Sequence, residues 1–196
     1  RTSLPEIQIQ PTRSSKERRF ACLTPAQCVD ESSWRVFAEV LKRSTATTLM
    51  VNLGNLSHDA QSYVTQIFAD EGIAPARLGF VNATSEEEIC HAWNLVDIGL
   101  APIGDSGELV LNACLWMGRP FIAFMSDAPW SGHPGILLES LGLANLIACS
   151  LEDYLEKSLA LIDSPPLNGL RELVITSQPS PQELAIAFET SLQNIQ

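Results

Sequence analysis

Apolar runs of strand length alternate along this chain with amphipathic stretches of helix length, and this alternation constrains the fold more than any other feature. The strand-like runs are residues 19–24, 48–53, 77–82, 96–103, 120–125 and 143–149. The stretches with helical periodicity are residues 31–43, 58–71, 86–94, 107–117, 135–141 and 151–162. Helix-length crossovers between apolar strands are typical of parallel sheets that carry helices on both faces. The sequence therefore predicts an α/β fold with a doubly wound, Rossmann-like parallel sheet of about six strands.

The composition allows one globular domain with a large core, because 45% of the 196 residues are hydrophobic and 18% are charged. We expect a polar lead-in over residues 1–17, the α/β domain over residues 18–176, and a helix within residues 177–196 that packs on the domain or on a neighbour. Proline-containing breaks isolate this last helix, at residues 182–193. No apolar run approaches the roughly 20 residues of a membrane span, and the start is too polar for a signal peptide. We therefore expect a cytoplasmic protein.

Charge is distributed unevenly along the sequence. The net charge is −11, and residues 44–196 carry only four basic side chains against 18 acidic ones. Such a surface repels the phosphate backbone of nucleic acids, so we expect no nucleic-acid partner. The basic cluster from Arg13 to Arg19 is interpreted as a solvated lead-in before the first strand, with a role as an electrostatic handle as the alternative.

The five cysteines are odd in number and lack the spacing of zinc ligands. We expect reduced and mostly buried thiols, without a disulfide framework or a metal site. Among the tryptophans, Trp34, Trp93 and Trp116 lie at packing positions of predicted helices, so we expect them in the core. Trp130 lies in a loop with proline and glycine and is expected at a ligand or partner surface.

The first candidate binding site is the turn Gly104-Asp105-Ser106-Gly107-Glu108, between an apolar run and the next helix. In a parallel sheet such a turn lies at the carboxyl end of a strand, where free backbone N–H groups and the helix dipole favour an anion. Asp105 and Glu108 oppose an anion at that place. Two interpretations stay open: the acids cap the helix, or Ser106 and Gly107 bind a phosphate that Mg²⁺ or Mn²⁺ bridges to the acids.

His133 is the second candidate ligand, because it lies between glycines just before the next helix and can face the same cleft. Loop flexibility explains these glycines equally well. The sequence contains no nucleophile elbow, Walker loop, GxGxxG or HExxH pattern. We therefore assign no catalytic residue.

Two segments have a specific pattern: residues 115–120 read Leu-Trp-Met-Gly-Arg-Pro and residues 140–147 read Ser-Leu-Gly-Leu-Ala-Asn-Leu-Ile. Further matching segments are residues 20–23, Trp34, and residues 40–43, 72–80 and 95–97. In this order and spacing, from Phe20 to about Leu173, the chain resembles the C-terminal donor-binding lobe of GT-B glycosyltransferases, most closely the O-GlcNAc transferase/SPINDLY family. The resemblance implies a Rossmann-like lobe that binds a UDP-sugar and faces a second lobe. The expected partners are a missing N-terminal lobe, a second copy of the chain or another protein.

The resemblance also implies which positions hold the donor: a His-Thr-Thr turn and a later Asp on one helix, a lysine after the first strand, and a histidine before the strand at Leu95. The corresponding residues of this chain are, in that order, Glu108, Leu109, Val110, Ala113, Pro25 and Ile89. Because the phosphate- and ribose-binding groups are replaced, we expect no bound cofactor, and a UDP-sugar only by resemblance. Two function classes remain open. One is a nucleotide-sugar-binding lobe that is catalytically incompetent as this chain, and the other is a pseudoenzyme serving as a scaffold or protein-interaction module.

Overall fold

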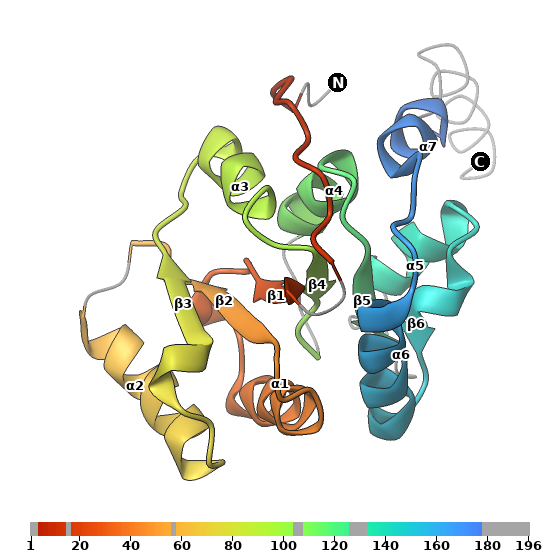
Figure 1. Cartoon of the computed structure of the whole chain (residues 1–196). Helices are drawn as coiled ribbons and strands as arrows, with labels where there is room; N and C mark the ends of the chain where they lie inside the picture. The colour runs from red at the N-terminus through yellow and green to blue at the C-terminus, as the bar shows by residue number, and fades with distance from the viewer. Residues whose placement is uncertain (1–3, 15–16, 56–57, 104–107, 126–132, 178–196) are drawn as a thin grey trace, which may run out of the picture.

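The computed structural model describes residues 4–14, 17–55, 58–103, 108–125 and 133–177 (Figure 1). Its centre is a six-stranded sheet in the order β3-β2-β1-β4-β5-β6, in which every neighbouring pair is parallel. The strands are β1 (Arg19–Cys22), β2 (Thr48–Asn52), β3 (Leu78–Val81), β4 (Ile98–Leu100), β5 (Phe121–Phe124) and β6 (Ile147–Ala148). This order is that of a doubly wound, Rossmann-like sheet, which confirms the predicted fold class.

Helices cover both faces of the sheet (Figure 1). They are α1 (Glu31–Arg43), α2 (His58–Asp70), α3 (Glu86–Trp93), α4 (Glu108–Trp116), α5 (His133–Ser140), α6 (Leu151–Asp163) and α7 (Leu170–Ser177). Contacts place α2, α1 and α6 on one face and α3, α4 and α5 on the other, with α7 packed on α4. The sequence pattern predicted no helix at α7. The helix predicted over residues 182–193 lies outside the described residues.

The helix starts follow from local sequence. Aspartate and serine are strong N-cap residues because their side-chain oxygens accept the free N–H groups of the first turn. The three caps are Asp30 accepting from Ser33 at 2.9 Å, Ser85 accepting from Glu88 at 3.2 Å, and Ser150 accepting from Asp153 at 3.1 Å. These caps explain why the predicted starts of α1, α3 and α6 agree with the structure.

The end of α4 depends on Gly118. This residue has φ +68°, and its N–H donates to Leu115 O at 2.9 Å while the N–H of Arg119 donates to Cys114 O at 2.9 Å. These two bonds form a Schellman motif, which requires the left-handed backbone that glycine adopts without strain. The chain thereby turns directly from α4 into β5.

Aromatic side chains form part of the core between the sheet and the α1 face. Trp34 makes edge contacts with Phe37 and Phe68, with ring centroids 5.8 and 6.2 Å apart, and Phe37 stacks on Tyr154 at 6.4 Å. Trp34 is buried as predicted. On the opposite face Trp93 is also buried, whereas Trp116 is only partly buried. Trp130 lies outside the described residues.

All five cysteines are free thiols. The expectation of burial is confirmed for Cys22, Cys90 and Cys114, whereas Cys28 and Cys149 are exposed. Burial raises the pKa of Cys22 to about 12. In the described part of the chain, no helix combines the length and apolar composition that a bilayer crossing requires.

The interpretation of residues 13–19 as a solvated lead-in is wrong for two arginines. Arg18 is only 7% exposed, and its guanidinium donates to the carbonyls of Leu161 and Ser164 at the end of α6. Arg13 forms an ion pair with Asp97 at 3.2 Å. Both arginines are drawn in because buried carbonyl and carboxylate oxygens require donors.

Candidate functional site

The loops that follow the strands form one edge of the sheet, which we call the carboxyl edge. They are residues 23–30, 53–57, 82–85, 101–107, 125–132 and 149–150. β1 and β4 are neighbours at the centre of the sheet, and the chain continues from them toward opposite sides. In doubly wound sheets, ligands bind in the crevice outside this switch point. The candidate site is therefore the carboxyl edge around the ends of β1 and β4.

The predicted site residues belong to this edge by their place in the chain. β4 ends at Leu100 and α4 begins at Glu108, so the predicted turn follows the carboxyl end of a strand. Gly104, Asp105, Ser106 and Gly107 lie outside the described residues. Glu108 begins α4 and His133 begins α5, but the positions of their side chains are not described. The ligand roles of these six residues remain predictions.

Asn52 joins three loops of the carboxyl edge. Its side-chain amide is buried, and Nδ2 donates to Leu23 O and Ala83 O, both at 3.0 Å. Its Oδ1 accepts the N–H groups of Gly54 and Ala83, also at 3.0 Å. Both donors and both acceptor sites of the amide are used. Asn52 is therefore a structural clasp, marked in the sequence only as a polar residue at the end of an apolar run.

The exit from β4 is fixed by two further bonds. Ser33 is buried on α1, and its Oγ accepts the N–H of Ile103 at 2.9 Å. Tyr154 on α6 donates its hydroxyl to Ala101 O at 2.9 Å. The backbone is thus held in place up to Ile103, immediately before the predicted turn.

The positions that the family resemblance assigns to the donor are largely apolar packing positions. Ile89, Val110 and Ala113 are buried among core side chains. The α3 and α4 helices that carry them are joined by a bond from Trp93 Nε1 to Val110 O at 3.1 Å. Leu109 is 41% exposed. These side chains offer no charge and no hydrogen-bond donor to a phosphate.

The described carboxylates of the carboxyl edge cap helices. Asp30 accepts from Ser33 N and from Ser32 Oγ at the start of α1. Glu88 accepts from the backbone N–H groups of Thr84 and Ser85, and these bonds lower its pKa to about 2. Over the described residues, no group of three or more His, Cys, Asp or Glu side chains is placed to hold a metal ion.

Basic residues are missing from the carboxyl edge by sequence. The loops that form it contain no lysine or arginine, whereas they contain Asp30, Asp105 and Asp127. The parallel pairing of all six strands brings these loops to one edge, although they are scattered over more than a hundred positions of the chain.

Four arginines instead donate to carbonyl groups at helix C-termini, where the helix dipole favours a cation. Arg18, Arg77 and Arg119 come just before strands, at the opposite edge of the sheet, and Arg171 lies on α7. They contact the ends of α6, α1, α3 and α4 through Leu161, Leu41, Trp93 and Trp116 respectively. These guanidinium groups are therefore committed to the fold on the side away from the candidate site.

Three solved structures that superpose on this chain are of glycosyltransferases. A mutant of the Thermobaculum terrenum O-GlcNAc transferase superposes with a TM-score of 0.80 at 20% identity, over 97% of this chain and 37% of that chain. A mutant of S. aureus TarM, solved in complex with ligands that include UDP, gives a TM-score of 0.55 at 14% identity over 87% of this chain and 34% of that one. The glycotransferase of kitacinnamycin gives 0.52 at 12% identity, over 90% and 43% of the two chains.

These comparisons show that the chain has the fold of a lobe of GT-B glycosyltransferases. It spans less than half the length of each of these three structures. No protein-family model matches the sequence, and a sequence search against curated proteins found no match. The likeness therefore establishes the fold alone.

Proposed function

We propose that this chain is a glycosyltransferase-like lobe that does not hold a nucleoside diphosphate and acts as a non-catalytic, pseudo-glycosyltransferase domain. The observation that carries the proposal is the absence of lysine and arginine from every loop of the carboxyl edge. The fold supports a lobe of the glycosyltransferase type, and the site residues argue against its usual ligand.

The physical reason is electrostatic. A diphosphate carries two to three negative charges, and a unit charge 4 Å away contributes roughly 4 kcal/mol at an effective dielectric constant of about 20. Asp105 would add repulsion at this edge, and no basic side chain of these loops offsets it. The buried Val110 and Ala113 cannot supply the missing hydrogen bonds. Binding of UDP by this lobe alone is therefore expected to be weak.

Calorimetric titration with UDP tests this proposal, run without metal and with Mg²⁺ or Mn²⁺. We expect a dissociation constant no tighter than about 1 mM in each case, equivalent to roughly −4 kcal/mol. Micromolar binding without metal would overturn the proposal. Micromolar binding that requires metal and is lost in Asp105→Asn would instead support the nucleotide-sugar-binding alternative, with Asp105 and Glu108 holding phosphate through the cation.

We also propose that a second lobe, a second copy or another protein covers the carboxyl edge. Exposed apolar side chains support this idea: Leu109 and Ile136, in the first turns of α4 and α5, are 41% and 57% exposed. Both helices begin at the carboxyl edge, so these apolar side chains add to a contact surface on that side. Sedimentation at rising concentration tests the second copy, and Trp130→Ala is expected to weaken association by about 1–3 kcal/mol without lowering the melting temperature.

A further inference from the structure

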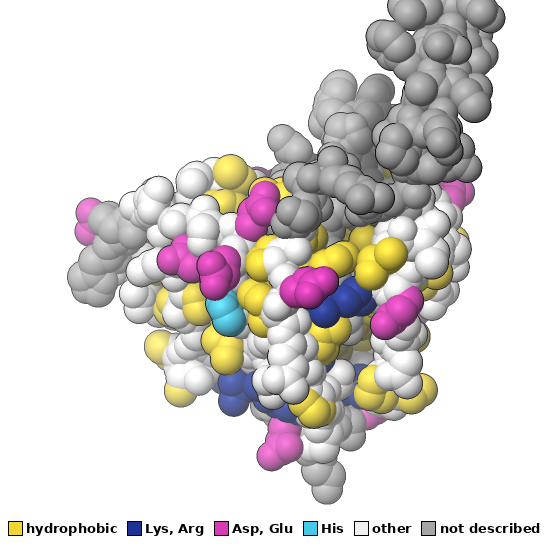
Figure 2. Space-filling model, turned by 90° about the horizontal axis from the view of Figure 1, so that it is seen from above, with side chains coloured by type: hydrophobic (Ala, Val, Ile, Leu, Met, Phe, Trp, Pro, Cys, Tyr) yellow, Lys and Arg dark blue, Asp and Glu magenta, His cyan; other side chains and the backbone are white. Residues whose placement is uncertain are grey.

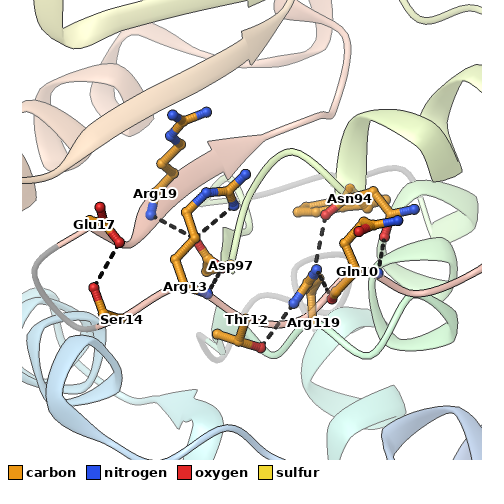
Figure 3. A network of polar contacts seen from close by, with 10 residues as sticks. Gln10, Thr12, Arg13, Ser14, Glu17, Arg19, Asn94, Asp97 and Arg119 are labelled. Atoms are coloured by element: carbon orange, nitrogen blue, oxygen red, sulfur yellow. Dashed lines mark hydrogen bonds and ion pairs between the residues drawn. The ribbon is translucent and has the colours of Figure 1, made fainter.

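Residues 4–13 form an extended segment, which we call the strap. It crosses the C-terminal ends of α3 and α4 and reaches α7 on the upper side of the molecule (Figure 1). The strap belongs to no strand of the sheet. Its position is set by side chains of the body, several of which Figure 3 shows at close range.

Side chains of the body bind the strap mainly through its main chain. Two further contacts use strap side chains: Arg119 Nη1 donates to Thr12 Oγ1 at 2.9 Å, and Arg13 pairs with Asp97 at 3.2 Å. The main-chain contacts are independent of the strap's own side chains, as in other modes of extended-peptide recognition. Written from donor to acceptor, these main-chain hydrogen bonds are Trp116 Nε1 to Pro5 O at 3.1 Å, Arg171 Nη2 to Ile7 O at 3.0 Å, Asn94 Nδ2 to Gln8 O at 2.9 Å, Gln10 N to Asn94 Oδ1 at 3.0 Å, and Arg119 Nη2 to Gln10 O at 2.7 Å.

Side chains alternate in burial over residues 6–10 of the strap, and Leu4 is buried as well. Ile7 and Ile9 are partly buried against the core, whereas Glu6, Gln8 and Gln10 are exposed. Ile9 lies over Gly118, where an added Cβ would be 3.5 Å from Ile9 Cδ1. This period of two is that of an extended chain with one face inward.

The groove under the strap is held by the body itself. Arg119 Nε donates to Trp93 O at 3.3 Å, and Arg171 Nε donates to Trp116 O at 2.6 Å. Arg171 also stacks on the Trp116 ring, 4.9 Å from its centroid. Because these contacts do not involve the strap, the donors stay aimed at the groove when the strap leaves, and such preorganisation lowers the cost of binding.

The strap does not fill the groove. A hollow of about 450 Å³ borders it on the α7 side and one of about 480 Å³ on the α3 side, and Gln10 lines both. Figure 2 looks onto this face, where basic side chains lie between apolar and acidic ones. The two hollows leave room beside the main chain of the strap for side chains larger than its own.

We infer that the groove lined by Asn94, Trp116, Gly118, Arg119 and Arg171 is a docking site for an extended peptide, occupied here by the strap. The contacts define the class of peptide. Its main-chain carbonyls face the donors of the groove, and it carries two apolar, preferably β-branched residues two positions apart. Side chains at the exposed positions are free to vary. The five groove residues lie away from the carboxyl edge, although the hollow on the α3 side extends to Asn82 and Ala83 of that edge. The inference does not depend on the proposed function.

A competition experiment with the full chain tests the inference. The strap variant Ile7→Asp/Ile9→Asp loses two of the three apolar side chains that the strap turns inward, the third being Leu4. Two inward carboxylates are expected to release the strap, so that its groove is open to a labelled peptide of residues 4–13. We expect saturable binding in fluorescence anisotropy, and at least about tenfold weaker binding to the unmodified chain, whose tethered strap competes at high effective concentration.

Matched variants define the site. A peptide with Gln8→Ala is expected to bind equally well, whereas one with both Asp substitutions is expected not to bind. Adding Arg171→Met to the strap variant removes the guanidinium that donates to the carbonyl of Ile7, and it is expected to weaken peptide binding about tenfold. Failure of a folded strap variant, checked by circular dichroism, to bind the peptide overturns the inference.

Hydrogen exchange of the unmodified chain gives a test that does not require a variant. The amides of Gln10 and Arg13 donate to Asn94 and Asp97. We expect them to be protected, yet to exchange at least about tenfold faster than the amides of β1, because a docked peptide opens locally. Exchange at the β1 rate would show that the strap is an inseparable part of the core, and unprotected amides would show that it is not docked.

Discussion

Asp97 and Arg13 form an ion pair across the start of the sheet. The Asp97 side chain is fully buried, and its Oδ2 lies 3.2 Å from Arg13 Nη1. The same carboxylate accepts the backbone N–H groups of Arg13 and Arg19 at 2.9 and 3.0 Å (Figure 3). One side chain therefore fixes both the end of the strap and the start of β1.

Replacing Asp97 with asparagine should destabilise the protein by about 2–3 kcal/mol. The amide keeps the shape of the carboxylate but loses its charge and one of its two oxygens, which together accept from Arg13 N, Arg13 Nη1 and Arg19 N. Urea unfolding at pH 7 measures the loss. Glu17→Gln is the matched control, since Glu17 is exposed and its side chain bonds only Ser14 Oγ among the described contacts. A loss for Asp97→Asn no larger than that of the control would contradict the assigned role.

Asn52→Ala removes the clasp between three loops of the carboxyl edge. The substitution leaves buried backbone groups of Leu23, Gly54 and Ala83 without their hydrogen bonds to Asn52. We therefore expect a loss of about 2–4 kcal/mol in the free energy of unfolding. Asn55→Ala, in the same loop but exposed, should change stability by less than about 0.5 kcal/mol. Equal effects of the two variants would show that the Asn52 bonds contribute little.

Gly99 and Gly79 both lie in strands but differ in their surroundings. A Cβ on Gly99 would lie 2.7 Å from Phe121 Cβ and 3.1 Å from Cys114 Sγ, whereas a Cβ on Gly79 would meet nothing within 4 Å. Gly99→Ala should therefore cost about 1–3 kcal/mol. Gly79→Ala should be neutral or slightly stabilising because it restricts the unfolded chain. Thermal melting of the two variants decides, and similar melting temperatures would refute the expected difference.

The pKa of Glu88 falls from 4.5 to about 2 because the folded chain donates N–H groups to the charged form. A lowered pKa means that this group stabilises the fold above pH 4.5 and loses its contribution as the pH falls toward 2. The stability difference between the unmodified chain and Glu88→Gln should therefore shrink over that pH range. The matched variant is Glu87→Gln, since Glu87 is exposed and 3.8 Å from His91. Urea midpoints from pH 7 to 2.5 measure both, and a constant difference for Glu88→Gln would argue against the cap.

Hydrophobic periodicity and capping residues predicted most of the helices and strands. The range 31–43 predicted for the first helix agrees with α1, which has an aspartate cap and a buried face. The run 96–103 was too long for its strand, since β4 covers only Ile98–Leu100. Val96 is buried although it precedes the strand. An apolar run marks the residues that are buried, and these need not all form the hydrogen bonds of a strand. α7 was missed because its eight residues follow a proline-rich break and carry only two buried side chains.

The candidate site was predicted only as a location. The alternation of elements indicated that the turn 104–108 lies between a strand and a helix; β4 ends at Leu100 and α4 begins at Glu108, which confirms the two flanking elements. The clasp of Asn52 was missed, since its partners lie as far as 31 residues away. The strap was also missed, because Ile7 and Ile9 alternate with polar residues over too short a stretch to stand out.

The sequence by itself determined the parallel α/β class, the helix caps and the acidic character of the chain, because hydrophobic period and capping act over a few residues. Only the tertiary structure decided the strand order and the separation of charge between the two edges of the sheet. It also decided the docking of the strap, where Arg13 meets Asp97 across 84 residues and Arg119 meets Thr12 across 107. The physical reason is that buried donors and acceptors take whichever partners the packed chain brings within reach, and that proximity is not encoded by neighbouring residues.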